Sequence, residues 1–420
     1  MSEERVSCEA GGCRRDADDC RCGARAGAID PSRRDNATAA SPASADGASP
    51  VTAASTTPDI APRGRVLVAM SGGVDSSVVA HLLVAEGYEC VGATMRLATN
   101  EDDRPGERTC CSTDDVADAR SACWDAGIRH HTFDYTREFA RDVIDPFVAA
   151  YEAGLTPNPC VACNRHLKFG ALLDRALELG CDHLATGHYA RVTHDDAGWH
   201  LLKGVDPAKD QSYFLYSLTQ EKLPHVLFPL GGMRKDPEVR ELAERLGVAA
   251  AHKKDSEGIC FVPGGDHLRF IEERTGRTAP EGDVLDTEGN VIGRHQGALR
   301  YTLGQRKGLG VACARPVYVC AIDTAANTVT LGDEDRLMAG TLVATDWNWV
   351  SGKAPSGPVR GGAKVRYHQP DQACTATQLP DGRVRVEFEQ PQRAITPGQA
   401  VVLYQGNELL GGGTIERVGE

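Results

Sequence analysis

The sequence predicts an α/β protein with a doubly wound parallel sheet, followed by a small, mainly helical central domain and a C-terminal antiparallel β-barrel. Three observations predict it: strand and helix patterns alternate from Arg65 to about residue 186, the pattern over about 220–280 is polar and helical, and short β-rich runs follow from about 283. Alternating strands and helices are typical of a sheet covered on both faces, whereas short strands between turn residues are typical of a barrel or sandwich.

The α/β pattern begins with Val66–Met70, an apolar run that ends at Ser-Gly-Gly and predicts a buried parallel strand. Residues Val74–Glu86 then show helical spacing of apolar side chains until Gly87 ends the helix. The alternation continues with strands at Cys90–Met95, Arg129–Asp134 and His183–Thr186, and helices at Asp114–Ala126, Arg137–Glu152 and Arg165–Leu179.

The later segments predict a helix at Asp236–Leu246, and then β-strands. The β-rich runs are separated by Gly, Pro, Asn and Asp at short spacings, which favours one small antiparallel barrel or sandwich. They are Tyr318–Ile322, Thr328–Leu331, Ala363–Tyr367, Val384–Phe388 and Ala400–Tyr404.

The size and composition are those of a multidomain globular protein. The chain has 420 residues, of which 41% are apolar and 25% charged, and at roughly 100–200 residues per domain it holds two to four domains. No apolar run approaches the eighteen or so residues of a membrane span, and the N-terminus lacks the apolar segment of a secretory signal. We therefore expect a cytoplasmic protein with no membrane partner.

The N-terminal 62 residues differ in composition from the remainder. They contain no Phe, Trp, Tyr or Leu, so they cannot bury enough apolar surface to fold, and we expect a disordered tail over 1–62. Its four cysteines lack the paired spacing of structural zinc, which favours a loose tail over a metal knuckle; they are Cys8, Cys13, Cys20 and Cys22. We then expect the doubly wound domain at 63–225, the central domain at 226–290 and the β-barrel domain at 291–420.

A glycine-rich loop, Ser71-Gly72-Gly73-Val74-Asp75-Ser76-Ser77, lies between the first predicted strand and helix. Backbone N–H groups, hydroxyls and a helix N-terminus at such a turn favour phosphate binding. The Walker pattern GxxxxGK[ST] and the dinucleotide pattern GxGxxG are both absent. The SGGxDSS string resembles instead the PP-loop of enzymes that cleave ATP between its α- and β-phosphates, so we expect ATP binding.

The chain has fifteen cysteines, and in a reducing compartment this argues against a disulfide framework and for thiol or metal chemistry. Cys160 and Cys163 occupy a segment whose two prolines predict a loop that leads into the helix at Arg165, where the helix dipole would lower the pKa of the Cys163 thiol. Cys260 follows two lysines, and Cys110 and Cys111 form a vicinal pair. The cysteines in apolar periodic segments are expected in the core: Cys90, Cys123, Cys181, Cys313, Cys320 and Cys374.

A PP-loop alone is compatible with several reactions, and further motifs separate them. The strings SGGVDSS, TPNPCVACNRHLKFG, ATGHYAR, KDQSYFL, KKDSEGICF and the GxHxGxxxYTxGQRxGLG pattern over 293–310 resemble, in order and approximate spacing, those of the bacterial and organellar tRNA-specific 2-thiouridylase family. The resemblance covers about Arg65 to Val402, all but the tail.

The resemblance implies a PP-loop (HUP-like) fold and ATP-dependent replacement of the C2 oxygen of the wobble uridine, U34, by sulfur, giving 2-thiouridine, AMP and pyrophosphate. It implies MgATP, a tRNA anticodon stem-loop and a persulfide sulfur-donor protein as partners. It implies that Cys260 carries the persulfide and Cys163 resolves it as the second catalytic cysteine.

The same resemblance assigns binding residues. Those implied for ATP are Ala69, Met70, Ser71, Gly72, Gly73, Val74, Asp75, Ser76, Met95 and Gly187. Those implied for tRNA are Asn158, Pro159 and Cys160 at the target base, and His188, Lys209, Asp210, Gln211, Arg366, Tyr367 and Gln399 elsewhere. His188 could instead cap a strand end, and Arg366 could be a solvated barrel residue.

The sequence departs from the family at Cys160, where many members have Asp. A carboxylate therefore cannot act as a general base at this position. Cys111, Cys160 and Cys163 would match the three-thiolate set that some related thiolases use for a [4Fe–4S] cluster, so this cluster is kept as an alternative cofactor.

The net charge of −13 argues against nucleic acid binding over the whole surface. However, the segment from Asn290 to Ile322 contains no Asp or Glu, and it includes Arg294, Arg300, Arg306, Lys307 and Arg315. Smaller basic clusters occur at His252-Lys253-Lys254 and at Arg360, Lys364 and Arg366. Such clusters suit a polyanion, although a solvated basic face is the usual explanation for them.

Two other functions remain compatible with the residues. One is adenylation of a small molecule, which leaves the β-rich domain and the paired cysteines without a role. The other is a non-catalytic sulfur carrier or iron–sulfur protein that binds tRNA without modifying it.

Overall fold

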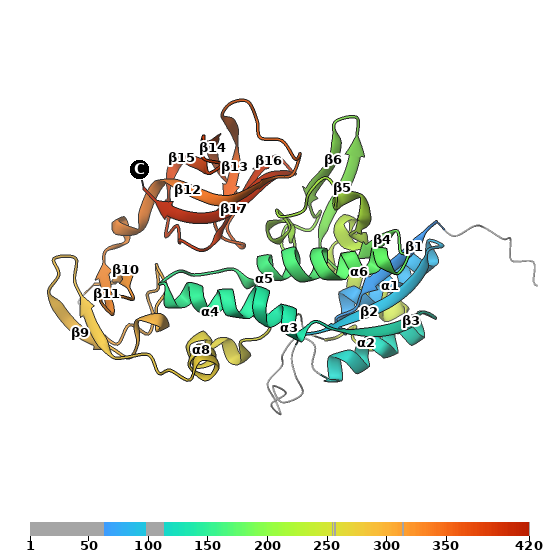
Figure 1. Ribbon diagram of the computed structural model, residues 1–420, viewed down its shortest axis with the longest axis horizontal. Coiled ribbons are helices and arrows are strands. Elements are labelled where there is room, and N and C mark those ends of the chain that lie inside the picture. The colour runs from blue at the N-terminus through green and yellow to red at the C-terminus, as the bar shows by residue number, and fades with distance from the viewer. Residues whose placement is uncertain (1–62, 98–112, 254, 256–257, 313–314, 420) are drawn as a thin grey trace, which may run out of the picture. The chain divides into compact units, whose positions relative to one another are not determined.

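The computed structural model describes residues 63–97, 113–253, 255, 258–312 and 315–419 (Figure 1). The predicted disordered tail with its four cysteines, the Cys110-Cys111 pair and Cys313 lie outside these ranges. Among the described residues, no helix is both long and apolar enough to cross a membrane.

Five parallel strands form the first sheet, in the order β3-β2-β1-β4-β7. They are β1 (Arg65–Ala69), β2 (Glu89–Arg96), β3 (Arg129–Asp134), β4 (His183–Ala185) and β7 (Val226–Leu227). The chain runs outward from β1 through β2 to β3 and then returns to place β4 on the other side of β1. The carboxyl ends of β1 and β4 therefore flank a topological switch point, where open α/β sheets bind ligands.

Helices cover both faces of this sheet. On one face, Val66 and Val68 pack in a cluster with residues of α1 (Val74–Ala85), α2 (Thr113–Asp125) and α7 (Arg240–Arg245). On the other, Leu67 and Leu184 pack against the helical run made of α5 (Pro159–Ala162), the π-helical η3 (Cys163–Leu172) and α6 (Leu173–Glu178). Alternate residues of β1 thus face opposite layers, which confirms the doubly wound fold.

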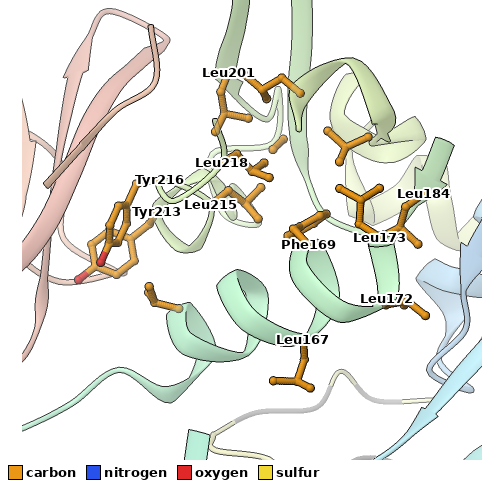
Figure 2. Close-up of a cluster of buried hydrophobic side chains, with 14 of the residues drawn as sticks. Leu167, Phe169, Leu172, Leu173, Leu184, Leu201, Tyr213, Leu215, Tyr216 and Leu218 are labelled. Carbon is orange, nitrogen blue, oxygen red and sulfur yellow. The ribbon is translucent and has the colours of Figure 1, made fainter. Parts of the chain in front are cut away.

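The second cluster also includes the segment that follows a β-hairpin, β5 (Ala190–Asp195) and β6 (Gly198–Lys203). Figure 2 shows Phe169, Leu172 and Leu173 on the helical run, Leu201 on β6, and Tyr213, Leu215, Tyr216 and Leu218 after it. These side chains are almost completely buried, so this core holds the cysteine-bearing helix in place.

The remaining helices lie between the strands in sequence. One continuous helical stretch consists of α3 (Thr136–Phe139), η2 (Ala140–Ile144) and α4 (Asp145–Glu152), as the periodicity predicts. The central region contains η7 (Lys235–Val239), α7 and α8 (His267–Thr275). Asp266 caps α8 by accepting a hydrogen bond from the Arg269 backbone N–H, and left-handed Gly276 ends it.

The β-rich part of the chain forms two sheets, where the sequence pattern favoured one barrel. A four-stranded sheet has the order β10-β11-β8-β9, with β8 and β11 parallel. Its strands are β8 (Gly282–Leu285), β9 (Val291–His295), β10 (Tyr318–Asp323) and β11 (Thr328–Gly332). Its own core contains Val284, Val319 and Val329, so the first two β-rich runs belong here. A run of five residues cannot reveal which of two cores it fills.

The other sheet is a closed antiparallel barrel of six strands in the order β12-β15-β14-β13-β16-β17, with β12 also pairing with β17. The strands are β12 (Met338–Trp349), β13 (Val359–Lys364), β14 (Gln372–Gln378), β15 (Val384–Arg393), β16 (Ala400–Gln405) and β17 (Glu408–Val418). The hairpin β5–β6 extends this sheet through β17, where Glu408 pairs with Leu202. The barrel and the α/β domain thus share backbone hydrogen bonds.

Two of the differences from the predicted element boundaries affect residues of the predicted site. The cysteine-bearing helix begins at Pro159 and not at Arg165, because proline at the first helical position lacks only an N–H that the helix does not need. The strand predicted at Ala363–Tyr367 ends at Lys364, so Arg366 and Tyr367 lie in the following turn.

Candidate active site

The glycine-rich loop follows β1 at the switch point and leads into α1. Gly72 has a φ of 71°, and a Cβ there would lie 2.4 Å from the Asp115 carbonyl oxygen, so only glycine fits. The Ser71 backbone N–H donates to Ser76 Oγ at 3.2 Å, which fixes the turn. No side chain caps the N-terminus of α1 at Gly73. The turn therefore suits an anionic group such as phosphate.

Residues of the neighbouring strands complete this loop. Met70 donates its backbone N–H to the Ala93 carbonyl at 2.8 Å, and the Thr94 hydroxyl donates to the Met70 carbonyl at 2.9 Å. Gly187 lies against the loop after β4, since a Cβ there would be 2.9 Å from Asp75 Cβ. The fold thus brings together residues 69–76 and Gly187, while Met95 lies buried on adjacent β2.

A buried lysine that sequence reasoning missed pairs with the loop. Lys235 is 1% exposed, and its Nζ lies 2.6 Å from Asp75 and 3.2 Å from Asp255. The Tyr189 hydroxyl donates to Asp75 at 2.8 Å, and burial, together with the Asp75 charge, raises the Tyr189 pKa. Asp75 is thus held by two donors that face it from other segments.

Asp255 lies five residues before Cys260 and also binds Lys209, at 2.8 Å. Burial would raise the Asp255 pKa, but the Lys209 hydrogen bond and the Lys235 charge lower it below its ordinary value. Lys253 donates to Asp115 at 2.7 Å, to Asp118 at 3.0 Å and to the Gly72 carbonyl at 3.3 Å. Lys253 is therefore anchored on the phosphate loop and on the helix beside it, seven residues before Cys260.

Because the helix begins at Pro159, Cys160 and Cys163 both lie within it and not in a loop before it. With the N-terminal cap at Asn158, Cys160 lies in the first turn and is exposed, while Cys163 follows that turn and is half-buried. The dipole argument therefore applies more directly to Cys160 than to Cys163. Asn164 donates to the Phe214 carbonyl at 3.2 Å, and its buried Oδ1 has no hydrogen-bond partner among the residues that the structure describes.

Cys260 is half-buried and packs against the same hydrophobic cluster as Cys163. The next residue, Phe261, packs edge-on against Phe139 and Phe147, with ring centroids 5.6 and 5.1 Å away. The fold thus places two cysteines that are 97 residues apart in sequence against one core.

Tyr367 belongs to a group of packed aromatic rings. The Tyr367 ring lies 4.5 Å from both the Phe214 and the His368 ring centroids. Burial, with the charges of Asp210, Asp206 and Cys160, raises the Tyr367 pKa to about 12. Tyr367 is therefore a neutral ring near the exposed thiol, and aromatic faces of this kind can stack on nucleic acid bases.

The other predicted RNA-contacting residues make internal contacts. Asp210 accepts hydrogen bonds from the Gly204 and Ser212 backbones at 3.1 Å, and Gln211 accepts from the Tyr189 backbone at 3.1 Å. His188 is 8% exposed, lies 2.7 Å from the Thr186 hydroxyl, and has a pKa well below its ordinary value because of burial. It is therefore a neutral, internally bonded histidine.

Arg366 and Gln399 join segments of the fold. The Arg366 guanidinium donates to the Ala394 carbonyl at 2.9 Å and to the Thr396 hydroxyl at 3.1 Å, so Arg366 is not the solvated barrel residue that was one alternative. Gln399 donates to the Thr156 carbonyl at 2.9 Å. The barrel thus holds the loop that precedes Asn158.

The described residues contain no group of three or more His, Cys, Asp or Glu side chains placed to hold a metal ion. Cys111, one of the three thiolates considered for an iron–sulfur cluster, lies outside them.

Most of the cysteines predicted to be structural are buried. Cys90, Cys123, Cys181 and Cys374 lie in the core, and Cys320 is half-buried. Burial raises the thiol pKa of Cys90 to about 11 and those of Cys123 and Cys374 to about 12. These thiols stay protonated near neutral pH and are poor nucleophiles.

Matches to three protein-family models define the class to which this protein belongs. The model of a tRNA methyl transferase HUP domain matches residues 64–264, that of a tRNA methyl transferase PRC-barrel domain matches 269–333, and that of an aminomethyltransferase β-barrel domain matches 339–415. Together with the loop at the switch point, these matches define a PP-loop nucleotide-binding protein of the HUP class with two appended β-domains.

Full-length relatives define the family within this class. The tRNA-specific 2-thiouridylase MnmA of Symbiobacterium thermophilum is 50% identical over 84% of this chain and 92% of that protein. The tRNA-specific 2-thiouridylase MnmA of Geobacter metallireducens is 49% identical over 84% of this chain and 97% of that protein. The chain therefore belongs to the tRNA-specific 2-thiouridylase MnmA family.

A more distant similarity is to a solved structure of the U34-tRNA thiolase NcsA from Methanococcus maripaludis with its [4Fe-4S] cluster. It is 23% identical and covers 51% of this chain and 67% of that one, with a TM-score of 0.30. A similarity of that size carries no inference about the chemistry of this chain.

Proposed function

We propose that this protein catalyses ATP-dependent 2-thiolation of the wobble uridine, U34, in tRNA, as a tRNA-uridine 2-sulfurtransferase. The observation that carries the proposal is a sequence identity of 50% and 49% to two 2-thiouridylases, over nearly the whole length of both proteins. The phosphate loop at the switch point and the two half-buried cysteines on one core support it independently.

The phosphate loop would bind MgATP, which is a substrate here. The residues proposed for this site are Ala69, Met70, Ser71, Gly72, Gly73, Val74, Asp75, Ser76, Met95 and Gly187. Activation is needed because the C2 oxygen of uracil is a poor leaving group. Transfer of AMP to that oxygen releases pyrophosphate and makes AMP the group that departs later. The uncapped N–H groups of α1 and the Ser71 hydroxyl would hold the phosphates during this transfer.

Cys260 and Cys163 would then deliver sulfur. The terminal sulfur of a Cys260 persulfide attacks C2, and the C2–O bond breaks as AMP leaves. The Cys163 thiolate next attacks the Cys260 sulfur, so that the persulfide S–S bond breaks, its electron pair remains on the sulfur bound to C2, and a Cys163–Cys260 disulfide forms. A dithiol reductant must reduce that disulfide before the next turnover.

The target uridine would leave its stack in the anticodon loop to reach the exposed helix start. Asn158, Pro159 and Cys160 are proposed to meet this base, and the Tyr367 ring, whose pKa the Cys160 charge affects, is proposed as a stacking surface. The other residues proposed for RNA binding make the internal contacts described above, so we propose that they act on RNA binding indirectly, by holding their loops in place. They are His188, Lys209, Asp210, Gln211, Arg366 and Gln399.

The partners follow from this chemistry. A persulfide-bearing donor protein would load Cys260, because the chain needs a source of sulfur at the oxidation level of a persulfide. A cytoplasmic location is proposed, since that is where an anticodon stem-loop substrate is available. No step above uses an iron–sulfur cluster; iron and acid-labile sulfide in active, anaerobically purified protein would require a different sulfur-transfer step.

The experiment is a reaction of the full chain with unmodified tRNA, MgATP, a persulfide donor and a dithiol, followed by mass spectrometry of the digested RNA. We expect 2-thiouridine, AMP and pyrophosphate in equal amounts. AMP without 2-thiouridine would favour adenylation of a small molecule, and tRNA binding without AMP would favour a non-catalytic carrier; either result would contradict the proposal.

A further inference from the structure

The buried ammonium of Lys235 joins two segments that the proposed reaction uses separately. It contacts Asp75, in the first turn after the phosphate loop, and Asp255, in the segment that leads to Cys260. These contacts bring together residues that are 160 and 20 positions away in sequence from Lys235. No other described lysine is as buried as this one at 1% exposure.

A lysine so deeply buried is costly unless its partners compensate for lost hydration, and an apolar side chain of similar size would often stabilise a fold more. Here two carboxylates supply the compensation, and the Tyr189 ring lies 5.9 Å from the ammonium. The backbone N–H of Lys235 also donates to Asp206 at 2.9 Å, so the residue is fixed at both ends.

The charge of Lys235 also matters to the phosphate loop. The Asp75 carboxylate lies at the helix N-terminus where phosphates are proposed to bind, and an uncompensated negative charge there would repel them. Lys235 supplies the compensating charge. The same ammonium is shared with Asp255, so a change in the field at Asp75 changes its attraction for Asp255.

A second link runs in parallel. Lys253, two residues before Asp255, donates to the Gly72 carbonyl at 3.3 Å and to Asp115 and Asp118. Burial would lower the Lys253 pKa, but its hydrogen bonds to Asp115 and Asp118 raise it, so it is charged at neutral pH. The segment before Cys260 is therefore tied to the phosphate loop at two neighbouring positions.

From these contacts we propose that Lys235 is a positioning residue. Through Asp255, it couples the binding of nucleotide at the phosphate loop to the placement of Cys260. The inference rests on the proposed function, because it takes the loop as the ATP site and Cys260 as the sulfur carrier. Coupling between two sites is reciprocal, so nucleotide binding alters the placement of Cys260, and a change in that placement alters nucleotide affinity.

The test measures alkylation of Cys260 by iodoacetamide, read by peptide mass spectrometry, with and without α,β-methylene-ATP, whose α–β bridge resists cleavage. In the full wild-type chain, the analogue should change the Cys260 alkylation rate by about fivefold or more. The variant D255N keeps the shape of the side chain and removes its charge. It should still bind the analogue by calorimetry, but its alkylation rates with and without analogue should agree within about a factor of two.

D371N is the matched control. Asp371 accepts a hydrogen bond from Lys203 at 2.9 Å and is 33% exposed, against 28% for Asp255. It should keep the full nucleotide response. The variant K235M breaks the link at its other end and should match D255N; if it fails to fold, D255N still decides the question.

Three results would each overturn the proposal. In the first, wild type binds the analogue but its Cys260 alkylation rate does not change. In the others, D255N keeps the full change in alkylation rate, or D255N no longer binds the analogue. A chain that shows the response and its loss in D255N, but makes no 2-thiouridine, would refute the proposed function and leave the coupling standing. A chain that thiolates tRNA, but whose Cys260 alkylation rate does not change with nucleotide, would refute the coupling and leave the proposed function standing.

Discussion

At the scale of single residues, the phosphate loop depends on the missing side chain of Gly72. The positive φ and the Asp115 carbonyl oxygen together leave no room for a Cβ. A string of small residues after a strand predicts such a turn. The close approach of α2 to it depends on tertiary packing, and the sequence pattern does not contain that information.

We predict that Gly72→Ala lowers affinity for ATP at least about tenfold, because the added Cβ displaces the loop or α2 and strains the backbone. The measurement is calorimetric titration with α,β-methylene-ATP. Gly87→Ala is the control, since Gly87 has a similar φ of 87° and a Cβ added there would have nothing within 4 Å. It should share the backbone strain but change the affinity less than about twofold. Equal affinities for the two variants would show that the contact at Gly72 does not shape the site.

The residues missed by sequence reasoning were mainly charged groups that folding buries. Lys235 lies in a polar stretch and resembles any surface lysine, and its role depends on Asp75 and Asp255, which arrive from distant segments. Tyr189 and Asp255 lie in the strings ATGHYAR and KKDSEGICF, which singled out their segments but not these side chains. Charge pairing over such sequence distances cannot be deduced from spacing in one sequence.

At the scale of elements, the strands and helices of the α/β domain could be predicted because each has a clear apolar period. Val66–Met70, for example, differs from the observed β1 by one residue at each end. The hairpin β5–β6 was not predicted, since its buried and polar residues do not alternate cleanly. It gains stability by pairing with β17 of the barrel, and that is a tertiary interaction.

His200 connects this hairpin to β17. Its Nδ1 lies 2.6 Å from Glu408, its Nε2 lies 2.9 Å from Asp195, and these hydrogen bonds raise its pKa, Glu408 contributing most. A histidine whose pKa is higher when folded stabilises the fold below its unfolded pKa of about 6.5, and this contribution disappears as the pH rises through the folded value.

We therefore predict that His200→Gln destabilises the protein at pH 5.5, by up to about 1 kcal/mol for a surface pair of this kind, and has little effect at pH 9. Denaturant unfolding at the two pH values measures the difference. His194→Gln is the control in the same hairpin, because the His194 ring lies against Trp199, with centroids 4.7 Å apart. A His200→Gln effect that is larger at pH 9 than at pH 5.5 would contradict the assignment.

At the scale of the whole molecule, the change from an α/β pattern to a β-rich pattern could be predicted because composition changes along the chain, whereas the distribution of surface charge could not. In each of the two smaller predicted basic clusters, some of the basic side chains make internal contacts. Lys253 pairs with Asp115 and Asp118, Lys364 lies 3.5 Å from Asp210, and Arg366 binds backbone carbonyls. Arg306 and Lys307, by contrast, are exposed in the acid-free segment.

The charge distribution could not be predicted because the sequence does not show whether a basic side chain faces solvent or a buried carboxylate. The excess of acidic residues, with a net charge of −13, makes internal pairing of lysines common. The surface most suited to a polyanion is therefore the exposed part of segment 290–322, and the cysteine helix with Tyr367 is the place that we propose for the target base.

The central claim is that sulfur passes to tRNA through Cys260 and Cys163, and a single-turnover assay tests it most directly. Protein loaded with persulfide and freed of excess donor is mixed with MgATP and unmodified tRNA, and 2-thiouridine is quantified by mass spectrometry. Wild type should form about one product per loaded chain, and Cys163→Ala and Cys260→Ala should each lose about a thousandfold of the rate. Product formation by both variants at the wild-type rate would contradict the account.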